Sequence, residues 1–454
     1  MNTNPTMQKA YIAWQLGSNL RERRLRFKRY TFGDQWGDMT ADKDGNRMTE
    51  RELCLSRGSN PVTNNIIRQL VKTVVGCYRS TRKAECDNID ILETDARTFE
   101  EYLISGCAVQ RVIAANGMTL SLPVSPARFF TGSITDFTGR DVELIGELHD
   151  MSLKQVMMRH SHGDRQRAMK IKEIYSTDFM RNTGRRFRMT GESHNDNLDF
   201  YHADAGLCRV IEVWSLDATE QLRCHDEATG RLYTAPVSQT AALQREKARR
   251  KKKGIAPLHT RWEMVPQWNC RFFSPTGELI DEFTAPDHPY IFRFYPLIDG
   301  EIHSFVEDVV EQQRNINRLL SLNDRILATA AKGVLLFPDN QESRNMPVEQ
   351  VADNWTQPDG FVMYRCVPGM PGPQQIHSSP GNLGVSTMID QQLRLISEVS
   401  GVSNALRGFS STGDGSAQLY RQRYESALVA LSDIFDSFNS FIALRDRKLS
   451  SFAL

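Results

Sequence analysis

The sequence predicts an α+β protein made of several lobes. Long stretches with an apolar residue at every third or fourth position indicate amphipathic helices, and shorter stretches that alternate apolar and polar residues indicate strands. The order of these stretches also indicates an α+β protein with several lobes, because a β-rich segment separates two of the helices. With 454 residues, the chain can form two or three domains or one large multi-lobed subunit with a substantial core.

The composition is that of a soluble globular protein. Hydrophobic residues make up 40% and charged residues 24%, and Lys+Arg 56 balance Asp+Glu 55. Because the net charge is near zero, any contact with nucleic acid is expected to be local. No long apolar run and no signal-peptide core is present, so we expect neither membrane insertion nor secretion. The eight cysteines form no C-x-x-C pair, which favours reduced thiols.

The first half of the chain is predicted to begin with helices and to continue as a mixed α/β lobe to about Tyr233. A helix is expected over Gln8–Tyr30, a second from Pro61 through NNIIRQLVKTVVGCYRSTR, and a short one near Thr98–Ser105. Strand patterns follow in AVQRVIAA, TLSLPV, CRVIEVWSL, EQLRC and GRLYT.

The segment ALQREKARRKKKGIAP (242–257) carries seven basic residues between Arg245 and Lys253. Ser238 as a cap, good helix formers through Lys253 and Gly254 as a stop predict a helix here. Cations near a helix C-terminus are favourable by roughly 0.3 to 1 kcal/mol. Five consecutive cations repel one another, however, so a negative partner would make better physical sense.

The second half is predicted to be helical around loops. A β-rich insertion with a Ser-Pro-Thr-Gly turn follows Gly254, and a long helix runs from Ser304 to Ala331. A Pro/Gly-rich stretch occupies Met346–Gly384, and a third long amphipathic helix covers Gly415–Arg447.

No motif assembles a catalytic site. There is no P-loop, no G-x-S-x-G elbow and no H-E-x-x-H. The Gly-rich piece Phe409–Gln418 lacks a preceding strand and a lysine, so a flexible connector is favoured over a phosphate loop. His160 and His162, and the pair Cys224 and His225, lack a complete ligand set. The histidines are interpreted as loop residues on a solvated surface, and the cysteines as largely buried thiols. We therefore expect no catalytic residue, no metal and no cofactor.

Aromatic residues close to the basic run allow two interpretations. Trp262, Trp268, Phe272 and Phe273 could stack nucleic-acid bases, as in single-strand binders. Aromatic residues that alternate along strands are more often core, which is the interpretation we favour. The basic run also allows two interpretations, a contact with nucleic acid or a helix face that is exposed to solvent and needs no partner.

Four motifs, taken in order, resemble the portal proteins of tailed bacteriophages. They are YTFGDQWGD after a basic helix, NNIIRQLVKTVVGCYRSTR after Pro61, VEDVVEQQRNINRLLS after a β insertion, and ISEVSGVSNALRG before a Gly/Ser loop and a long final helix. The resemblance lies in order and spacing from roughly Gly33 to Ala443. It is strongest to the branch with a GDQW segment and a D-x-x-x-x-Q-R-x-x-N helix.

The resemblance implies a non-enzymatic ring, usually of twelve subunits, at one vertex of the capsid in the virion, assembled in the host cytoplasm. Double-stranded DNA would pass through it during packaging and ejection. The implied partners are other copies of the chain, the large terminase, the major capsid or scaffold protein and a head-completion or tail adaptor protein. A portal subunit has a mixed α/β wing, a stem of two helices, a clip that projects from the end of the stem, a tunnel loop and a helical crown.

Carried onto this chain, the resemblance implies six regions. They are 1–236 (N-terminal α/β part of the wing), 237–253 (stem helix 1), 254–302 (clip), 303–331 (stem helix 2), 332–384 (tunnel-loop region and wing) and 385–454 (C-terminal helical wing and short crown).

Two sets of candidate site residues follow. The candidates for DNA or channel contact are Arg245, Lys247, Arg249, Arg250, Lys251, Lys252 and Lys253. The candidates for stem and subunit contact are Gln313, Arg314, Asn317, Arg318 and Asp324. A conduit should touch phosphates rather than base edges, and cyclic symmetry would multiply a local run of cations into a belt. The sequence leaves open whether the basic run faces the channel, the capsid or a neighbouring subunit.

The alternative function is a nucleic-acid-processing enzyme, such as a nuclease, with the basic run and the aromatic strands as its groove. It needs a carboxylate or histidine metal site that the sequence does not assemble. The mass in solution separates the two, because a portal forms a closed ring of many copies.

Overall fold

The computed structural model describes residues 4–452, except 84–87, 116–117, 137, 187–197, 204–205, 333, 339–340, 344–345, 357–360, 377–383, 404–405 and 408–416. The chain forms two compact units. Unit 1 comprises Met1–Arg26, Arg82–Ser304 and Asp433–Leu454, and unit 2 comprises Phe27–Thr81 and Phe305–Ser432. Helices and antiparallel strands occur in both, so the predicted mixture of α and β structure is confirmed.

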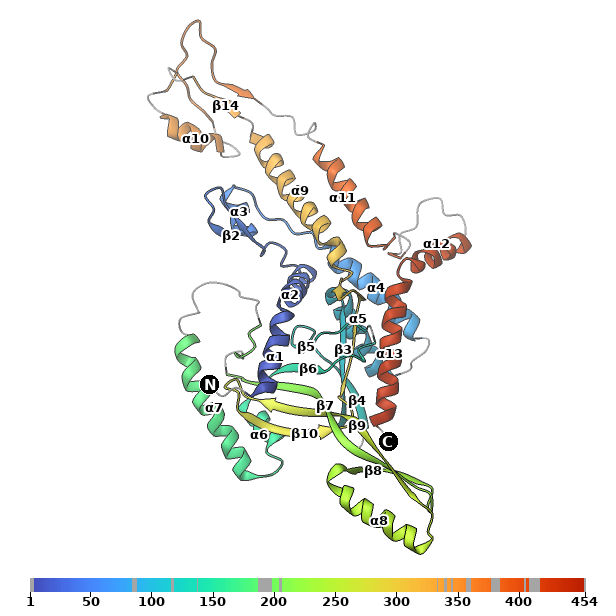
Figure 1. Ribbon diagram of the computed structural model, residues 1–454. Coiled ribbons are helices and arrows are strands. Elements are labelled where there is room, and N and C mark those ends of the chain that lie inside the picture. The colour runs from blue at the N-terminus through green and yellow to red at the C-terminus, as the bar shows by residue number, and fades with distance from the viewer. Residues whose placement is uncertain are drawn as a thin grey trace. The chain divides into compact units, whose positions relative to one another are not determined.

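Unit 1 is built on two antiparallel sheets (Figure 1). The larger has the order β10-β9-β7-β6-β5, with β8 also paired to β7, and the smaller has the order β11-β3-β4. The strands of unit 1 are β3 (Cys107–Ala115), β4 (Met118–Pro123), β5 (Phe129–Thr131), β6 (Leu144–Met151), β7 (Cys208–Asp226), β8 (Arg231–Pro236), β9 (Leu258–Phe273), β10 (Leu279–Ala285), β11 (Tyr290–Phe294), β12 (Pro296–Ile298) and β13 (Glu301–Ile302).

Helices surround these sheets. They are α1 (Pro5–Leu16), α2 (Ser18–Phe32, which continues into unit 2), α5 (Ile89–Ser105), α6 (Leu153–His160), α7 (Arg165–Arg186), α8 (Thr240–Lys253) and α13 (Ser432–Phe452). Helix α5 packs on β3 and also contacts α13, where the Phe99 and Phe438 ring centroids lie 4.8 Å apart. The Tyr102 hydroxyl donates a hydrogen bond to Ser437 Oγ at 2.8 Å.

The strands predicted in residues 254–302 are present, but they do not form a β domain of their own. Strand β9 pairs with β7 from Ile211↔Phe273 to Asp226↔Leu258, and β11 pairs with β3. The prediction of a separate β insertion is therefore wrong. Its cause is the length of β7, which continues through the separately predicted EQLRC strand and offers β9 a partner along its whole course.

Unit 2 is mainly helical. Its elements are β1 (Met39–Ala41), β2 (Arg47–Thr49), α3 (Glu50–Ser56), α4 (Ile66–Lys83), α9 (Glu307–Lys332), β14 (Val334–Leu336), α10 (Val348–Thr356), β15 (Gln374–Ile376), α11 (Val385–Val399) and α12 (Ala417–Val429). Helices α9 and α11 pack side by side (Figure 1). Between them in sequence lie α10 and the antiparallel pair β14–β15.

Two of the predicted long helices are each broken in two. The helix predicted over Gln8–Tyr30 divides at Gly17, whose N–H caps α1 on the Ala13 carbonyl at 3.3 Å. The helix predicted over Gly415–Arg447 divides into α12 and α13 beside the buried Leu431. Among the described residues no single helix is long and apolar enough to cross a membrane, and this broken pair meets the length and apolarity criteria only when its two parts are combined.

Polar side chains on α9 fix the start of α4. Gln313, which is fully buried, accepts hydrogen bonds at Oε1 from the N–H groups of Ile66 (2.9 Å) and Ile67 (3.3 Å). Its Nε2 donates to the Asn64 carbonyl at 2.6 Å. The first N–H groups of a helix have no partner inside the helix, and Gln313 satisfies two of them for α4.

Asn317 and Ser321 continue this stripe at four-residue spacing, which places all three side chains on one face of α9. Asn317 Oδ1 accepts from the Asn64 N–H at 3.1 Å, and Ser321 Oγ accepts from the Val62 N–H at 2.9 Å. These bonds hold the chain extended before α4. The prediction that this helix begins at Pro61 is therefore wrong, and α4 begins at Ile66.

The GDQW motif joins the same network through Gln35. Gln35 Oε1 accepts from Asn317 Nδ2 at 2.6 Å, while its Nε2 donates to the Tyr30 carbonyl (2.8 Å) and to Asn65 Oδ1 (3.1 Å). Asn65 Nδ2 in turn donates to the Thr31 carbonyl at 2.9 Å. We call Gln35, Asn65, Gln313, Asn317 and Ser321 the amide network. It joins three of the four motifs on which the resemblance rests.

We expect Gln313→Ala to destabilise unit 2, because the substitution leaves buried N–H groups of Ile66 and Ile67 without an acceptor. A buried unsatisfied group costs about 1 to 3 kcal/mol. Asp324→Ala on the exposed surface of α9 is the control, with an expected effect within about 0.5 kcal/mol. Hydrogen exchange of residues 62–67 measures the effect, and equal protection in both variants would contradict the capping role.

Candidate functional site

The basic run lies on α8, at the three-stranded end of the larger sheet (Figure 1). There β7, β8 and β9 form a ribbon whose small apolar core is shared with Leu243 of α8. No residue of α8 is buried. The predicted helix is present, but it begins at Thr240 after a short 3₁₀ turn, and Ser238 does not cap it. Gly254 ends it with φ 64°, as predicted.

Arg250 anchors the C-terminal end of α8 to the ribbon. Its Nη1 and Nη2 donate to the two carboxylate oxygens of Asp226 at 2.6 and 3.0 Å. Its Nε donates to Glu246 Oε1 at 3.0 Å. The hydrogen bonds from Arg250 hold the pKa of Asp226 well below its usual range. Arg250 is therefore a structural residue of the ribbon.

Two more cations of the run have partners within the ribbon. Arg249 donates from Nε and Nη2 to the Glu246 carboxylate, both at 2.8 Å. Bonds from Arg249 and Arg250 together lower the pKa of Glu246 to about 2. The Lys247 ammonium donates to Thr260 Oγ1 at 2.5 Å. Glu246, the acidic residue inside the run, thus organises its neighbours.

The remaining four cations point to solvent. Arg245, Lys251, Lys252 and Lys253 are exposed, and none has a hydrogen-bond or ion-pair partner among the residues that the structure describes. The basic run therefore consists of a paired part (Lys247, Arg249 and Arg250), the unpaired Arg245 at its start and a free lysine tip, Lys251–Lys253. This lysine tip is the part available to bind an external anion.

Three of the four candidate aromatic residues are buried and one is exposed. Trp268, Phe272 and Phe273 are 7%, 3% and 0% exposed, so the favoured core interpretation is confirmed for them. Trp262 is 55% exposed and lies opposite Leu222 in the β7–β9 register. Directly opposed residues of an antiparallel pair share one face of the sheet. Trp262 therefore lies on the face of the ribbon that α8 covers.

The candidates for stem and subunit contact include both buried and exposed side chains. Gln313 and Asn317 are 0% and 2% exposed, and their side chains bond to residues of unit 2 within the same chain. Arg314 and Arg318 both pair with Glu50, the latter at 2.9 Å. Arg318 and Asp324 are exposed and stay candidates for subunit contact.

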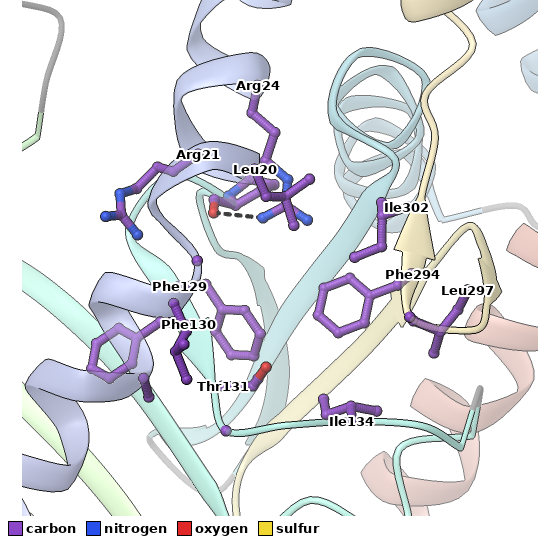
Figure 2. Close-up of a pocket in the computed structure, with 16 residues that line it drawn as sticks. Leu20, Arg21, Arg24, Phe129, Phe130, Thr131, Ile134, Phe294, Leu297 and Ile302 are labelled. Atoms are coloured by element: carbon purple, nitrogen blue, oxygen red, sulfur yellow. Dashed lines mark hydrogen bonds between the residues drawn. The ribbon is translucent and has the colours of Figure 1, made fainter.

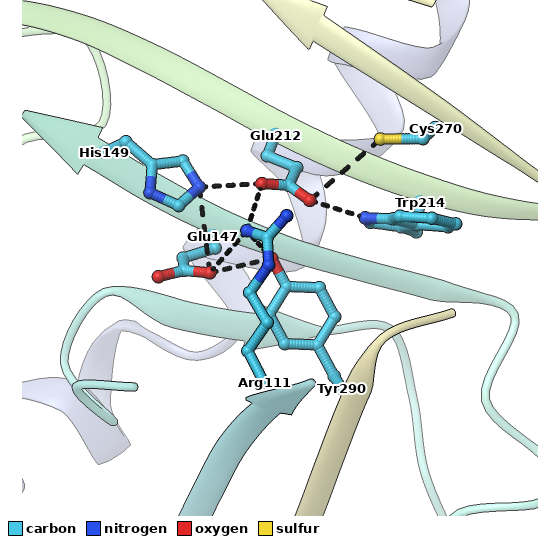
Figure 3. Close-up of polar contacts among 7 residues, drawn as sticks. All are labelled: Arg111, Glu147, His149, Glu212, Trp214, Cys270 and Tyr290. Carbon is cyan, nitrogen blue, oxygen red and sulfur yellow. Dashed lines mark hydrogen bonds and ion pairs between the residues drawn. The ribbon is translucent and has the colours of Figure 1, made fainter. Parts of the chain in front are cut away.

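A buried ionic cluster lies at the centre of unit 1 (Figure 3). Glu212 of β7 is fully buried and accepts from Arg111 Nη1 of β3 at 2.6 Å and from Trp214 Nε1 at 2.7 Å. His149 Nε2 of β6 lies 2.8 Å from the same carboxylate. The Tyr290 hydroxyl of β11 donates to Glu147 at 2.7 Å. The cluster thus ties the larger sheet to the smaller one.

The cluster contains a group that could in principle bind a metal. The ligand atoms of Glu147, His149 and Glu212 all lie within 4.8 Å of one another. Arg111 Nη1 already contacts both carboxylates, at 2.6 Å from Glu212 and 3.4 Å from Glu147. A guanidinium therefore occupies the position that a cation would take. We interpret the cluster as a structural ion-pair network.

The histidine interpretation is wrong for His160 and is confirmed for His162, which is exposed in a turn. His160 is 2% exposed rather than on the surface, and its ring centroid lies 4.5 Å from that of Phe272. His160 Nδ1 and His162 Nε2 lie 3.4 and 2.6 Å from Asp281. Cys224 is buried, whereas His225 is exposed on the opposite face of β7.

Most of the Gly-rich piece Phe409–Gln418 lies outside the described residues.

A comparison with models of protein families matches residues 138–453 to the phage P22-like portal proteins. The chain belongs to this family. The match covers more than two thirds of the chain and includes α8, α9, α11 and the three strands of the ribbon next to α8. A search of curated proteins found no match. Family membership makes this a phage portal protein, from a family that is structural rather than typically enzymatic.

We expect Glu212→Gln to cost roughly 3 to 5 kcal/mol of stability, because it leaves the buried Arg111 charge incompletely paired. The control is Glu282→Gln, which removes an exposed pair with Arg271 worth about 0 to 1 kcal/mol. Thermal unfolding of the two variants measures the difference.

The stability that the Glu212 carboxylate contributes is expected to depend on pH. Burial raises the pKa of Glu212, but Arg111, His149 and Trp214 outweigh burial and hold the pKa well below its usual range. The stabilisation is therefore complete above the unfolded value of about 4.3 and is lost as the pH falls toward the folded pKa. Below about pH 4 the wild type should approach the stability of Glu212→Gln. A constant gap between them down to about pH 2 would contradict this assignment.

Proposed function

We propose that the chain forms a portal ring at a capsid vertex and that double-stranded DNA passes through the ring during packaging and ejection. The observation that supports this most is the family match over residues 138–453. The proposed ring has about twelve copies. Its partners are the large terminase during packaging, the major capsid or scaffold protein around it, and a head-completion or tail adaptor protein afterwards.

We assign the stem to α9 and α11. A portal stem consists of two helices with a clip at their end, and α9 and α11 pack together with residues 334–376 between them in sequence. The pair β14–β15 closes the base of these intervening residues and α10 lies within them, which suits a clip. This assignment keeps 303–331 as a stem helix and replaces 237–253 by α11.

Unit 1 then corresponds to the wing. The regions predicted as stem helix 1 and clip, 237–253 and 254–302, share sheets and core with residues 107–226 in unit 1. The basic run therefore belongs to a ribbon that extends from the wing sheet. Its free lysine tip, repeated by the symmetry of a ring, would give a belt of positive charge.

We propose that the lysine tip contacts DNA phosphates without reading the sequence. Lysines that neutralise phosphates release counterions, so their contribution to binding falls with salt. Such contacts are weak enough to let DNA slide. The paired residues Arg249 and Arg250 hold the tip in place through Glu246 and Asp226.

We expect the purified protein to form closed particles of about twelve times the subunit mass of 51.7 kDa. Mass photometry or native mass spectrometry measures this directly. A monomer with metal-dependent nuclease activity would contradict the portal and favour the alternative enzyme.

We expect the triple substitution of Lys251, Lys252 and Lys253 by Ala to leave the ring intact and to weaken DNA binding. The slope of log K against log salt should fall by about 0.9 for each phosphate that the variant no longer neutralises. The control triple replaces Lys43, Arg47 and Arg51, which are exposed cations of unit 2.

Each other outcome of this experiment has a meaning. Loss of the ring in the lysine-tip variant would assign these residues to subunit contacts. An unchanged ring with an unchanged salt slope would show that the tip is only a solvated helix end.

A further inference from the structure

A cavity of about 200 Å³ lies in unit 1, between the junction of α1 and α2, strand β5 and the β12–β13 hairpin (Figure 2). Its walls are mainly apolar and include Leu20, Phe129, Phe294 and Ile302. The exposed residues Leu16 (78% exposed) and Gly300 line it as well and mark its mouth. We call this space the wing pocket.

Arg24 reaches into the wing pocket from α2 and is not fully satisfied. Its side chain is 7% exposed, with Nε donating to the Ser105 carbonyl at 3.1 Å and Nη1 to the Pro126 carbonyl at 3.3 Å. Its buried Nη2 has no hydrogen-bond partner. Figure 2 shows the Arg24 guanidinium beside Leu20, and its centre is 5.8 Å from the Phe294 ring. A buried N–H donor is thus left unused at an apolar wall.

A second buried arginine lines the same pocket one helical turn earlier. Arg21 is 9% exposed, its Nη1 donates to the Trp14 carbonyl at 3.0 Å, and its guanidinium lies 3.4 Å from the Trp14 ring centre. Burial, reinforced by the charge of Arg24, lowers the pKa of Arg21 to about 10. Arg21 thus adds a second, largely buried positive charge to the pocket lining, and its guanidinium lies against Trp14.

Neither arginine has a carboxylate partner at ion-pair distance among the residues that the structure describes. The Cys107 thiol interacts with Arg24 through its charge and a side-chain hydrogen bond, Glu101 acts on Arg24 through its charge, and Glu22 acts on Arg21, but no carboxylate forms an ion pair with either arginine. Buried charges without a counter-ion are costly, and proteins pair them or bind an ion there. An anion in the wing pocket would remove this cost.

We propose that the wing pocket binds a small organic carboxylate with an apolar body. The carboxylate would accept a hydrogen bond from Nη2 of Arg24, with Arg21 as a second positive charge in the pocket lining, and the body would lie against Phe129 and Phe294. A dry cavity of about 150 Å³ holds benzene, so this pocket suits a body of about six to eight carbon atoms. A phosphate fits less well, because its three oxygens would need more donors than this wall provides.

Binding at this pocket is independent of the portal function. It can be tested by titrating the full-length protein with octanoate and following the heat of binding. We expect saturable binding of octanoate, with acetate and octanol each weaker by about tenfold or more, since acetate lacks the apolar body and octanol lacks the charge.

Two variants locate the site. Arg24→Gln should weaken octanoate binding by about ten- to a hundredfold through loss of a charge-assisted hydrogen bond. Because Arg24 also supports the Ser105 and Pro126 carbonyls, Leu16→Trp at the exposed mouth provides a second variant that leaves Arg24 in place. Leu16→Trp should reduce binding by a similar factor. Met158→Trp, at an 84% exposed position on α6, is the matched control and should bind as the wild type does.

Three results would overturn the proposal. They are the absence of saturable octanoate binding, which would mean that the pocket holds only water, equal affinity for octanoate and octanol, and wild-type affinity in Leu16→Trp. None of them would bear on ring assembly, because the titration requires no DNA and no partner protein.

Discussion

The start of α4 depends on side chains from a helix that is almost 250 residues later in the chain. The first N–H groups of α4 and the extended residues before it find their acceptors in Gln313, Asn317 and Ser321. Because these groups are buried, each would cost free energy if it were left unpaired. This constraint explains the spacing of Gln313 and Asn317 in the D-x-x-x-x-Q-R-x-x-N motif, and it holds the GDQW segment against α9 through Gln35. In unit 2, neutral amides therefore join segments that apolar contacts alone would leave free to slide.

In unit 1, buried charged side chains rather than amides connect the two sheets. The larger sheet contributes Glu147, His149 and Glu212, and the smaller sheet contributes Arg111 and Tyr290. Removing one member leaves the others as uncompensated buried charges, so the cluster favours one arrangement of the two sheets. The sheet then determines where the basic helix lies. Strands β7 and β9 are long enough to carry α8 at their far end, where Asp226 holds Arg250.

Helices and strands with a clear period could be predicted from the sequence, and so could the left-handed glycine that ends α8. The apolar stripe of α4 and the buried Trp268, Phe272 and Phe273 follow the expected periodicity. Periodicity does not reveal pairing over long distances. The periodicity predicts two strands where the structure has the single strand β7. Helix α4 starts later than Pro61 suggests, because side chains of α9 cap it at Ile66. Gln313 and Asn317 look like surface residues by composition, and their four-residue spacing along the apolar face is the signal that they are buried.

We propose that this member of the phage P22-like portal family is a conduit that touches DNA weakly through the lysine tip. In this proposal α9 and α11 form the stem, the amide network holds one end of α9, and the free cations belong to a ribbon of unit 1. Single-particle electron microscopy of the assembled protein tests this account most directly. It predicts a closed ring in which α9 and α11 of every subunit pack around the central channel, with residues 334–376 at one end. A ring with this helix pair on its outer rim, or no ring at all, would contradict it.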